Sequence, residues 1–155
     1  FSLTGWKVGY ITAAPEMLAP IARAHQFLTF TTPPNLQAAA AYGLGKADDY
    51  FTRLAADMQA GRDRLRAGLE RLGFAVADCH GTYFLTVDVR SVGFSGSDLD
   101  FCTAITREAG VAAIPYSAFY VERPPEGQVR FAFCKPPATL DEAIARLGAW
   151  LERRR

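Results

Sequence analysis

The hydrophobic pattern of this chain changes its period at Gly73, and this change constrains the fold more than any other feature of the sequence. Upstream, apolar residues recur every three to four positions, as on the buried stripe of an amphipathic helix, at Phe51, Leu54, Met58, Leu65, Leu69 and Leu72. Downstream, they take every second position, as on the buried face of a strand, at Tyr83, Leu85, Val87 and Val89. The helix is expected to begin at Asp48 or Asp49 and to stop at Gly73. Together the two periods predict a domain in which helices pack against a sheet.

Both periods return further along the chain. A second helix is expected to be capped by Ser97 and to stop at Gly110. Its predicted buried face consists of Leu99, Cys102, Ile105 and Ala109. Short apolar strands are expected at residues 111–114 and 129–134, joined by a proline-containing loop over residues 116–128.

A last helix follows the second of these strands. Thr139 and Glu142 have the spacing of a capping box at its start. Its apolar stripe would consist of Leu140, Ala143, Ile144, Leu147 and Leu151. The order helix, two strands, helix, two strands, helix predicts a compact α/β unit in which helices cover one face of a small sheet.

The first third of the chain is expected to hold a strand, a helical stretch and a loop. The apolar run at residues 10–14 favours a strand, and Pro15 and Pro20 fit early positions of short helices, where a missing N–H costs little. The helical stretch should end near Phe30, because residues 29–35 include two consecutive prolines that enforce a loop.

The helical pattern over residues 36–72 is interrupted at residues 43–45, which read Gly-Leu-Gly. Glycine weakens a helix, so we expect two helices with a break between them. We also expect a domain boundary at this break, which separates residues 1–45 from residues 46–155.

Charge and cysteine content argue against several classes of function. The 155 residues include 17 basic and 16 acidic ones, a net charge of +1, so no broad attraction to nucleic acid or to a membrane surface is expected. No apolar run reaches the length of a membrane span, about eighteen residues. Cys79, Cys102 and Cys134 are an odd number without C-x-x-C spacing, which predicts neither a disulfide framework nor a metal site. We expect reduced, mostly buried thiols in a cytoplasmic protein.

Two basic residues are candidates for binding an anion. Lys7 stands between Gly5 and Gly9, where the small neighbours would let its ammonium reach a phosphate or a carboxylate. Arg130 shares its face of the predicted strand with Ala132 and therefore has room to present its planar fork. From these residues alone the plainer alternatives are favoured: an exposed lysine beside a turn, and a structural arginine paired with an acid.

The remaining polar residues do not form a second candidate site. His25 and His80 have no hydrolase signature around them. Asp98 and Asp100 stand at the start of a predicted helix, so we interpret them as helix-capping residues and not as paired catalytic carboxylates.

Several segments resemble class I/II pyridoxal-phosphate (PLP) aminotransferases, above all the kynurenine, glutamine and methionine aminotransferases. Residues 1–10, FSLTGWKVGY, are similar to the family segment that reads roughly S-x-x-K-T-[FY]-x-x-T-G-W-[KR]-[VIL]-G-[YW]. Residues 129–135, VRFAFCK, are similar to the family strand [IVF]-R-[FIL]-x-[FI]-x-K. Residues 81–84 and 110–115 also resemble family segments, so that the likeness runs from Phe1 to about Leu151.

The resemblance implies a role for each candidate. Lys7 matches the cation that binds the PLP phosphate, and Arg130 matches the clamp for the α-carboxylate of the substrate. The Schiff-base lysine would lie two residues before Phe1, so no catalytic residue is assigned within the chain. The implied fold is the C-terminal part of fold type I: a large-domain remnant, a long connecting helix and a small α/β domain.

The resemblance also implies an activity and its alternatives. The parent would be a cytoplasmic homodimer that transfers an amino group from an amino acid, such as methionine, glutamine or an aromatic one, to a keto acid. Another fold type I PLP enzyme, such as a carbon–sulfur lyase, would use the same cofactor. An effector-sensing domain of a transcription regulator and a bare interaction module are the alternatives from other classes.

Overall fold

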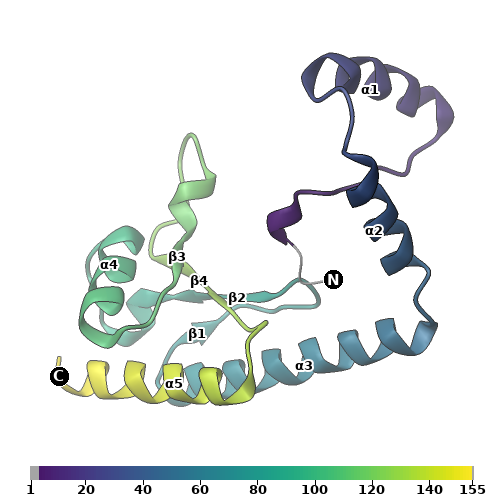
Figure 1. Cartoon of the computed structure of the whole chain (residues 1–155). Coiled ribbons are helices and arrows are strands. Elements are labelled where there is room, and N and C mark those ends of the chain that lie inside the picture. The colour runs from purple at the N-terminus through teal and green to yellow at the C-terminus, as the bar shows by residue number, and fades with distance from the viewer. Residues whose placement is uncertain (1–3, 155) are drawn as a thin grey trace. The chain divides into compact units, whose positions relative to one another are not determined.

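The computed structural model of the chain describes residues 4–154, which divide into two compact units between Thr52 and Arg53 (Figure 1). The N-terminal unit contains a short 3-10 turn, two helices and the start of a third: η1 (Thr4–Trp6), α1 (Pro15–Leu28), α2 (Pro34–Leu44) and α3 (Asp48–Arg71). The C-terminal unit contains the rest of α3 and the following elements: β1 (Ala75–Val76), β2 (Phe84–Asp88), η2 (Val89–Val92), α4 (Asp98–Ala109), β3 (Ile114–Pro115), η3 (Tyr116–Phe119), β4 (Gln128–Ala132) and α5 (Pro137–Glu152).

The helices of the N-terminal unit follow the proline pattern. Helix α1 begins at Pro15, where the missing N–H of proline costs nothing, and its last turn is closed by the Thr29 N–H, which donates to the His25 carbonyl. The loop at residues 29–33 and the break between α2 and α3 confirm the expectations from sequence. Pro20, however, lies inside α1 and not at an early position.

The prediction of a strand at residues 10–14 is wrong, because this segment has no regular secondary structure. A strand needs a neighbour for its N–H and C=O groups. In residues 4–154 the sheet takes all its strands from residues 75–132, so the apolar run at 10–14 has no strand beside it. Alternation of side chains cannot reveal whether such a neighbour exists.

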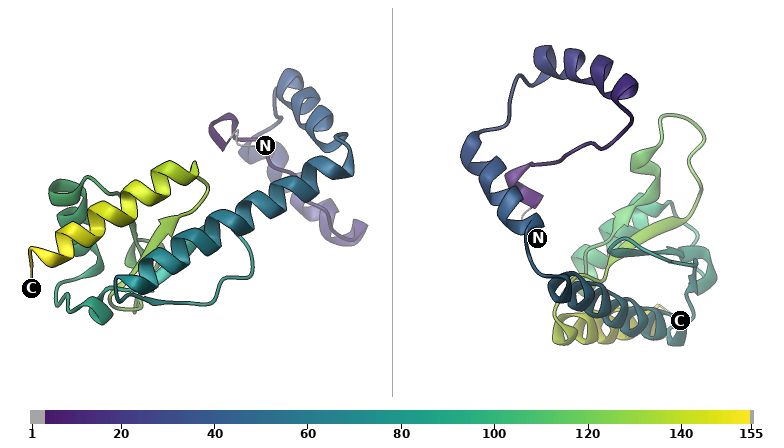
Figure 2. Two further views of the ribbon diagram at one scale, coloured as in Figure 1. Left: turned by 90° about the horizontal axis from the view of Figure 1, so that it is seen from below. Right: turned by 90° about the vertical axis from the view of Figure 1, so that its right-hand side faces the viewer.

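The sheet has the strand order β1-β2-β4-β3, and every pair is antiparallel. The long central pair sets Leu85 opposite Phe131 and Val87 opposite Val129. All four of these side chains are buried on one face, together with residues of α3, α4 and α5. Helices therefore cover one face of a small sheet, as the sequence predicts (Figure 2).

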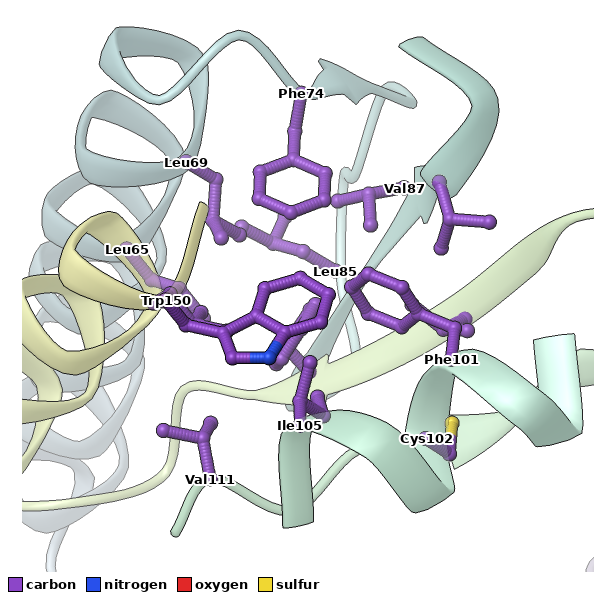
Figure 3. Packing of buried hydrophobic residues seen from close by; sticks show 14 of the residues in the cluster. Leu65, Leu69, Phe74, Leu85, Val87, Phe101, Cys102, Ile105, Val111 and Trp150 are labelled. Atoms are coloured by element: carbon purple, nitrogen blue, oxygen red, sulfur yellow. The ribbon is translucent and has the colours of Figure 1, made fainter. Parts of the chain in front are cut away.

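The core is centred on aromatic rings from α4, from α5 and from the segment between α3 and β1 (Figure 3). Phe101 of α4 meets Trp150 of α5 edge to face at a centroid distance of 5.6 Å, and it meets Phe74 in the same way at 6.1 Å. The Trp150 indole N–H donates to the Glu108 carboxylate at 2.7 Å, so the buried ring has a partner for its polar atom. These contacts fix α4 against α5.

Two details of helix geometry differ from expectation. Ser97 caps α4 in a capping box with Asp100, as its position predicts, but Leu99 is exposed and Phe101 takes its place in the core. Side chains two residues apart on an α-helix point in directions about 200° apart around the helix axis, so Leu99 and Phe101 cannot share a face. The capping box expected from Thr139 is also wrong, since α5 begins at Pro137, whose fixed φ starts the helix earlier.

Helices α3 and α5 lie side by side (Figures 1 and 2), and Gly68 makes this close approach possible. A Cβ atom at Gly68 would overlap Ile144 Cδ1 and would come within 2.7 Å of its Cγ1. At Gly148, across the same interface, the tightest atom is Leu72 Cδ2 at 3.1 Å, the end of a flexible side chain.

We therefore predict that Gly68→Ala lowers the free energy of unfolding by roughly 1–3 kcal/mol, although alanine is the better helix former. Urea unfolding measures the change, and Gly148→Ala serves as the matched control with a much smaller effect. Adding Ile144→Ala to Gly68→Ala should recover part of the loss. A Gly68→Ala protein as stable as the parent would show that the two helices separate readily.

Candidate functional site

Arg130 lies at the centre of β4, between β2 and β3. The register sets it opposite Thr86 on one side and Ile114 on the other. Its neighbours Val129 and Phe131 are buried in the core, so the guanidinium is on the face of the sheet that the helices leave uncovered. This agrees with the orientation expected from alternation in the sequence.

Two aromatic rings contact the guanidinium of Arg130. Its Cζ atom lies 3.4 Å from the centroid of the Phe84 ring and 4.5 Å from that of the Phe119 ring. A guanidinium stacks through its flat face and donates hydrogen bonds within its plane. The rings therefore hold the group in position without using any of its donors.

Within residues 4–154, no hydrogen bond from the Arg130 side chain to another residue is present. Arg130 Nε is enclosed and has no hydrogen-bond acceptor, and in the part of the chain that the structure describes no Asp or Glu forms an ion pair with Arg130. The alternative of a structural arginine paired with a nearby acid is therefore not what the described residues show. A buried donor without an acceptor is costly, and a carboxylate ligand at the fork of the guanidinium would provide the missing negative charge.

Lys7 belongs to the N-terminal unit and has an unusual backbone. Its φ is 54°, in the left-handed region, and its N–H closes the η1 turn on the Thr4 carbonyl at 3.2 Å. Non-glycine residues in this region cost energy and are frequent at ligand sites. The side chain is exposed, and no carboxylate of the described chain forms an ion pair with it. Lys7 and Arg130 lie in different units, one in each.

The sequence did not indicate that the carboxylate of Asp98 is buried. Asp98, expected to be a helix cap, is only 5% exposed. Its Oδ2 accepts the Ser117 N–H at 2.7 Å and its Oδ1 accepts the Ser117 hydroxyl at 2.9 Å. The capping partner of Ser97 is Asp100, and the hydrogen bonds from Ser97 lower the pKa of the Asp100 carboxyl.

Phe84 and Phe119 were also missed as site residues. Phe84 could have been noticed, because it falls on the same strand face as polar residues. Phe119 lies in the segment expected to be an irregular loop, where no periodicity tells which way a side chain points.

The described residues contain no cluster of His, Cys, Asp or Glu side chains that could hold a metal ion. Within the same residues, no helix has the length and apolar character needed to cross a membrane. The three cysteines are free: Cys102 is buried, Cys79 is half-buried and Cys134 is exposed, so the expectation of mostly buried thiols fails at Cys134.

Comparison with known proteins identifies one family. The family model "Aminotransferase class I and II" matches residues 1–147. A Mycobacterium tuberculosis protein named "Probable N-succinyldiaminopimelate aminotransferase DapC" is 43% identical over 164 residues, which cover 99% of this chain and 41% of that protein. The methionine aminotransferase of Escherichia coli K12 is 37% identical over 147 residues, which cover 95% of this chain and 38% of that protein. The chain thus spans about two fifths of the curated relatives it matches.

Solved structures agree with these relatives. The structure of N-succinyldiaminopimelate aminotransferase from M. tuberculosis superimposes with a TM-score of 0.86 at 43% identity, covering 96% of this chain and 39% of that one. The E. coli protein YbdL, whose structure identified a methionine aminotransferase function, superimposes with a TM-score of 0.84 at 37% identity, with the same coverage of the two chains.

The reactivity of the cysteines tests whether Cys102 is buried in the core. Burial, with a smaller contribution from the Asp98 carboxylate, raises the pKa of the Cys102 thiol to about 12. At pH 8–9 we therefore expect iodoacetamide to modify Cys134 in the native protein and to leave Cys102 unmodified until urea unfolds the chain, as peptide mass mapping would show. Because the thiol is held neutral in the folded state, the stability it contributes is complete below about pH 9 and is lost as the pH rises toward 12. Equal labelling of both cysteines in the native protein would contradict the burial.

Proposed function

Since the chain belongs to the class I and II aminotransferase family, we propose that it is the C-terminal portion of a PLP-dependent enzyme that transfers an amino group from an amino acid to a keto acid. The observation that carries the proposal is the Arg130 guanidinium, held by two rings and left without an acidic partner in the described chain. An amino acid always brings a carboxylate, and a planar fork binds a carboxylate through two parallel hydrogen bonds.

Arg130 would bind and orient the substrate. By fixing the carboxylate, the fork also fixes the rotation of the Cα atom and hence the direction of the bond that loses its proton. Phe84 and Phe119 lie against the guanidinium, and their apolar rings lower the local polarity, which would strengthen its attraction for an anion. PLP, when bound, supplies the electron sink for this chemistry.

Lys7 would hold the phosphate of PLP. An exposed ammonium beside open space at Gly5 and Gly9, on a backbone in the left-handed region, fits a phosphate that must be approached closely. The Schiff-base lysine would precede Phe1, and the boundary between the large-domain remnant and the small domain would lie near residue 45. We further propose that the complete enzyme is a cytoplasmic homodimer.

The substrate would be an amino acid with a sizeable side chain, such as methionine, glutamine or an aromatic residue. The names of the two relatives reported above include N-succinyldiaminopimelate and methionine, which share an α-carboxylate and differ in their side chains. The shared group is the one that Arg130 would bind. No named relative reported above is a carbon–sulfur lyase or a transcription regulator, so these alternatives are not favoured.

We predict that Arg130→Lys is nearly as damaging as Arg130→Ala in the complete enzyme, because lysine keeps the charge and loses the fork. For either variant, the loss of transition-state stabilisation calculated from kcat/KM for amino acids should be about 2–5 kcal/mol. The measurement compares amino acids with the amines that lack their carboxylate. The parent should strongly prefer the acids, and the variants should lose most of this preference.

Folding should change much less than activity, since Val129 and Phe131 carry the core contacts of this strand. Arg107→Lys, on the exposed surface of α4, is the matched control. If an Arg130 variant is largely unfolded while its folded fraction keeps the full preference for acids, then Arg130 is a structural residue.

A second prediction concerns the cofactor. Replacing Lys7 by alanine in the complete enzyme should weaken PLP binding roughly tenfold to a hundredfold, the effect of losing one charge-assisted contact to a phosphate. Lys7→Arg should keep most of the affinity, and Lys46→Ala, in the same unit, is the control. Titration of the apoenzyme with PLP measures all three. Unchanged affinity in Lys7→Ala would make Lys7 an ordinary surface lysine.

A further inference from the structure

The two rings that contact Arg130 are held in different ways. Phe84 is part of β2, which pairs with β4 along its whole length, so the backbone ladder of the sheet fixes its position. Phe119 is outside the sheet, at the end of η3, the turn that follows β3. Whatever holds η3 therefore decides where the second ring lies.

The hydrogen bonds within the η3 turn hold it only weakly, and its internal ring contact joins Tyr116 to Phe119 at a centroid distance of 6.3 Å. The turn is four residues long, and Pro115 at its start provides no side-chain cap. Short 3-10 turns have poor hydrogen-bond geometry. Its polar link to another element is through Ser117, whose N–H and hydroxyl both donate to the carboxylate of Asp98, at 2.7 Å and 2.9 Å.

Asp98 has no need to be buried for the sake of its own helix. The start of α4 is already capped by the reciprocal bonds of Ser97 and Asp100. Yet Asp98 is only 5% exposed, and it is the buried charged residue in the part of the chain that the structure describes. A buried carboxylate is tolerated where several donors meet it and a helix N-terminus lies beside it, and here Leu99 N–H is a third donor.

We propose that Asp98 and Ser117 are positioning residues for substrate recognition: they fix η3 so that Phe119 lies against the Arg130 guanidinium and holds its fork ready for a carboxylate. The inference rests on the proposed function of Arg130. A long arginine side chain that is already immobilised loses less freedom when a ligand binds. The ring occupies the face of the guanidinium and leaves its in-plane donors to the ligand.

The test uses the complete PLP-loaded enzyme with Phe119→Leu, which removes the ring, and Phe119→Tyr, which keeps it. Tyr120→Leu is the matched control, because it removes the adjacent ring, which contacts Tyr116 and not Arg130. Phe119→Leu should reduce the preference for an amino acid over its decarboxylated amine roughly threefold to tenfold, mainly through KM, whereas the tyrosine variant and the control should stay close to the parent.

Calorimetry provides a readout without turnover. The dissociation constant of pentanoate should rise in Phe119→Leu by the same factor, and that of pentanamide, the uncharged control, should not change. Ser117→Ala loses the hydroxyl bond to Asp98 and keeps the backbone bond, so it should fold and shift both measurements in the same direction by a smaller factor. Combined with Phe119→Leu, it should add nothing further, because both act through one ring.

Arg130→Lys separates this inference from the proposed function. If Arg130→Lys abolishes the preference for acids while Phe119→Leu changes neither the preference nor the pentanoate affinity, the clamp stands and the positioning role is overturned. If Arg130→Lys keeps the preference for acids, then both the role of Arg130 as a carboxylate clamp and the positioning role of Asp98 and Ser117 are wrong. A Ser117→Ala variant that matches Phe119→Leu in lost stability but keeps pentanoate affinity would make the link to Asp98 purely structural.

Discussion

The register of β4 between its neighbours is the constraint on which the rest of the C-terminal unit depends. Setting Val129 opposite Val87 and Phe131 opposite Leu85 buries these four side chains on the helix-covered face. The same register directs Arg130 to the other face. Because side chains alternate with a period of two, a slip of one residue would put the guanidinium into an aromatic core and expose the valine and phenylalanine. The packing of the core and the position of Arg130 therefore both follow from the register of this one strand.

The helices pack on only one of the two faces of the sheet. Residues of α3, α4 and α5 fill one face of the sheet, and the T-shaped contacts around Phe101 and the close approach at Gly68 leave little room for adjustment there. The opposite face carries Phe84 and Arg130, together with the turn that brings Phe119. A rigid core behind the sheet lets this face hold a charged group in a defined place, which a ligand site on a mobile loop could not do as well.

The hydrogen bonds between Asp98 and Ser117 connect helix α4 of the core to the η3 turn, which carries Phe119. Burying a carboxylate costs free energy, which three hydrogen bonds and the N-terminus of α4 offset. The result is a tie between a helix of the core and the turn over the site. Such a tie explains why an acidic residue is buried at a position where the helix is already capped by Ser97 and Asp100. The Asp98 carboxylate also contributes to the raised pKa of the buried Cys102 thiol, so it lies close enough to the core to affect it.

The sequence by itself determined the order of the helices and longer strands after residue 46, the cap at Ser97 and the face on which Arg130 lies, because these follow from local chemistry and from the alternation of side chains. The predicted buried faces were right for Leu65, Leu69, Leu85 and Val87 and wrong for Phe51 and Tyr83, which are exposed. Its family segments also indicated the aminotransferase family to which the chain belongs. Only the tertiary structure decided that residues 10–14 are not a strand, that Phe101 and not Leu99 enters the core, and that Arg130 contacts two rings and, among residues 4–154, forms no ion pair with an acid. Each of these depends on what lies across space from a residue. A strand requires a neighbour, and a helix face requires a sheet to pack on. Phe119 meets Arg130 from a turn that is bound through Ser117 to Asp98, 21 positions before Phe119 in the chain.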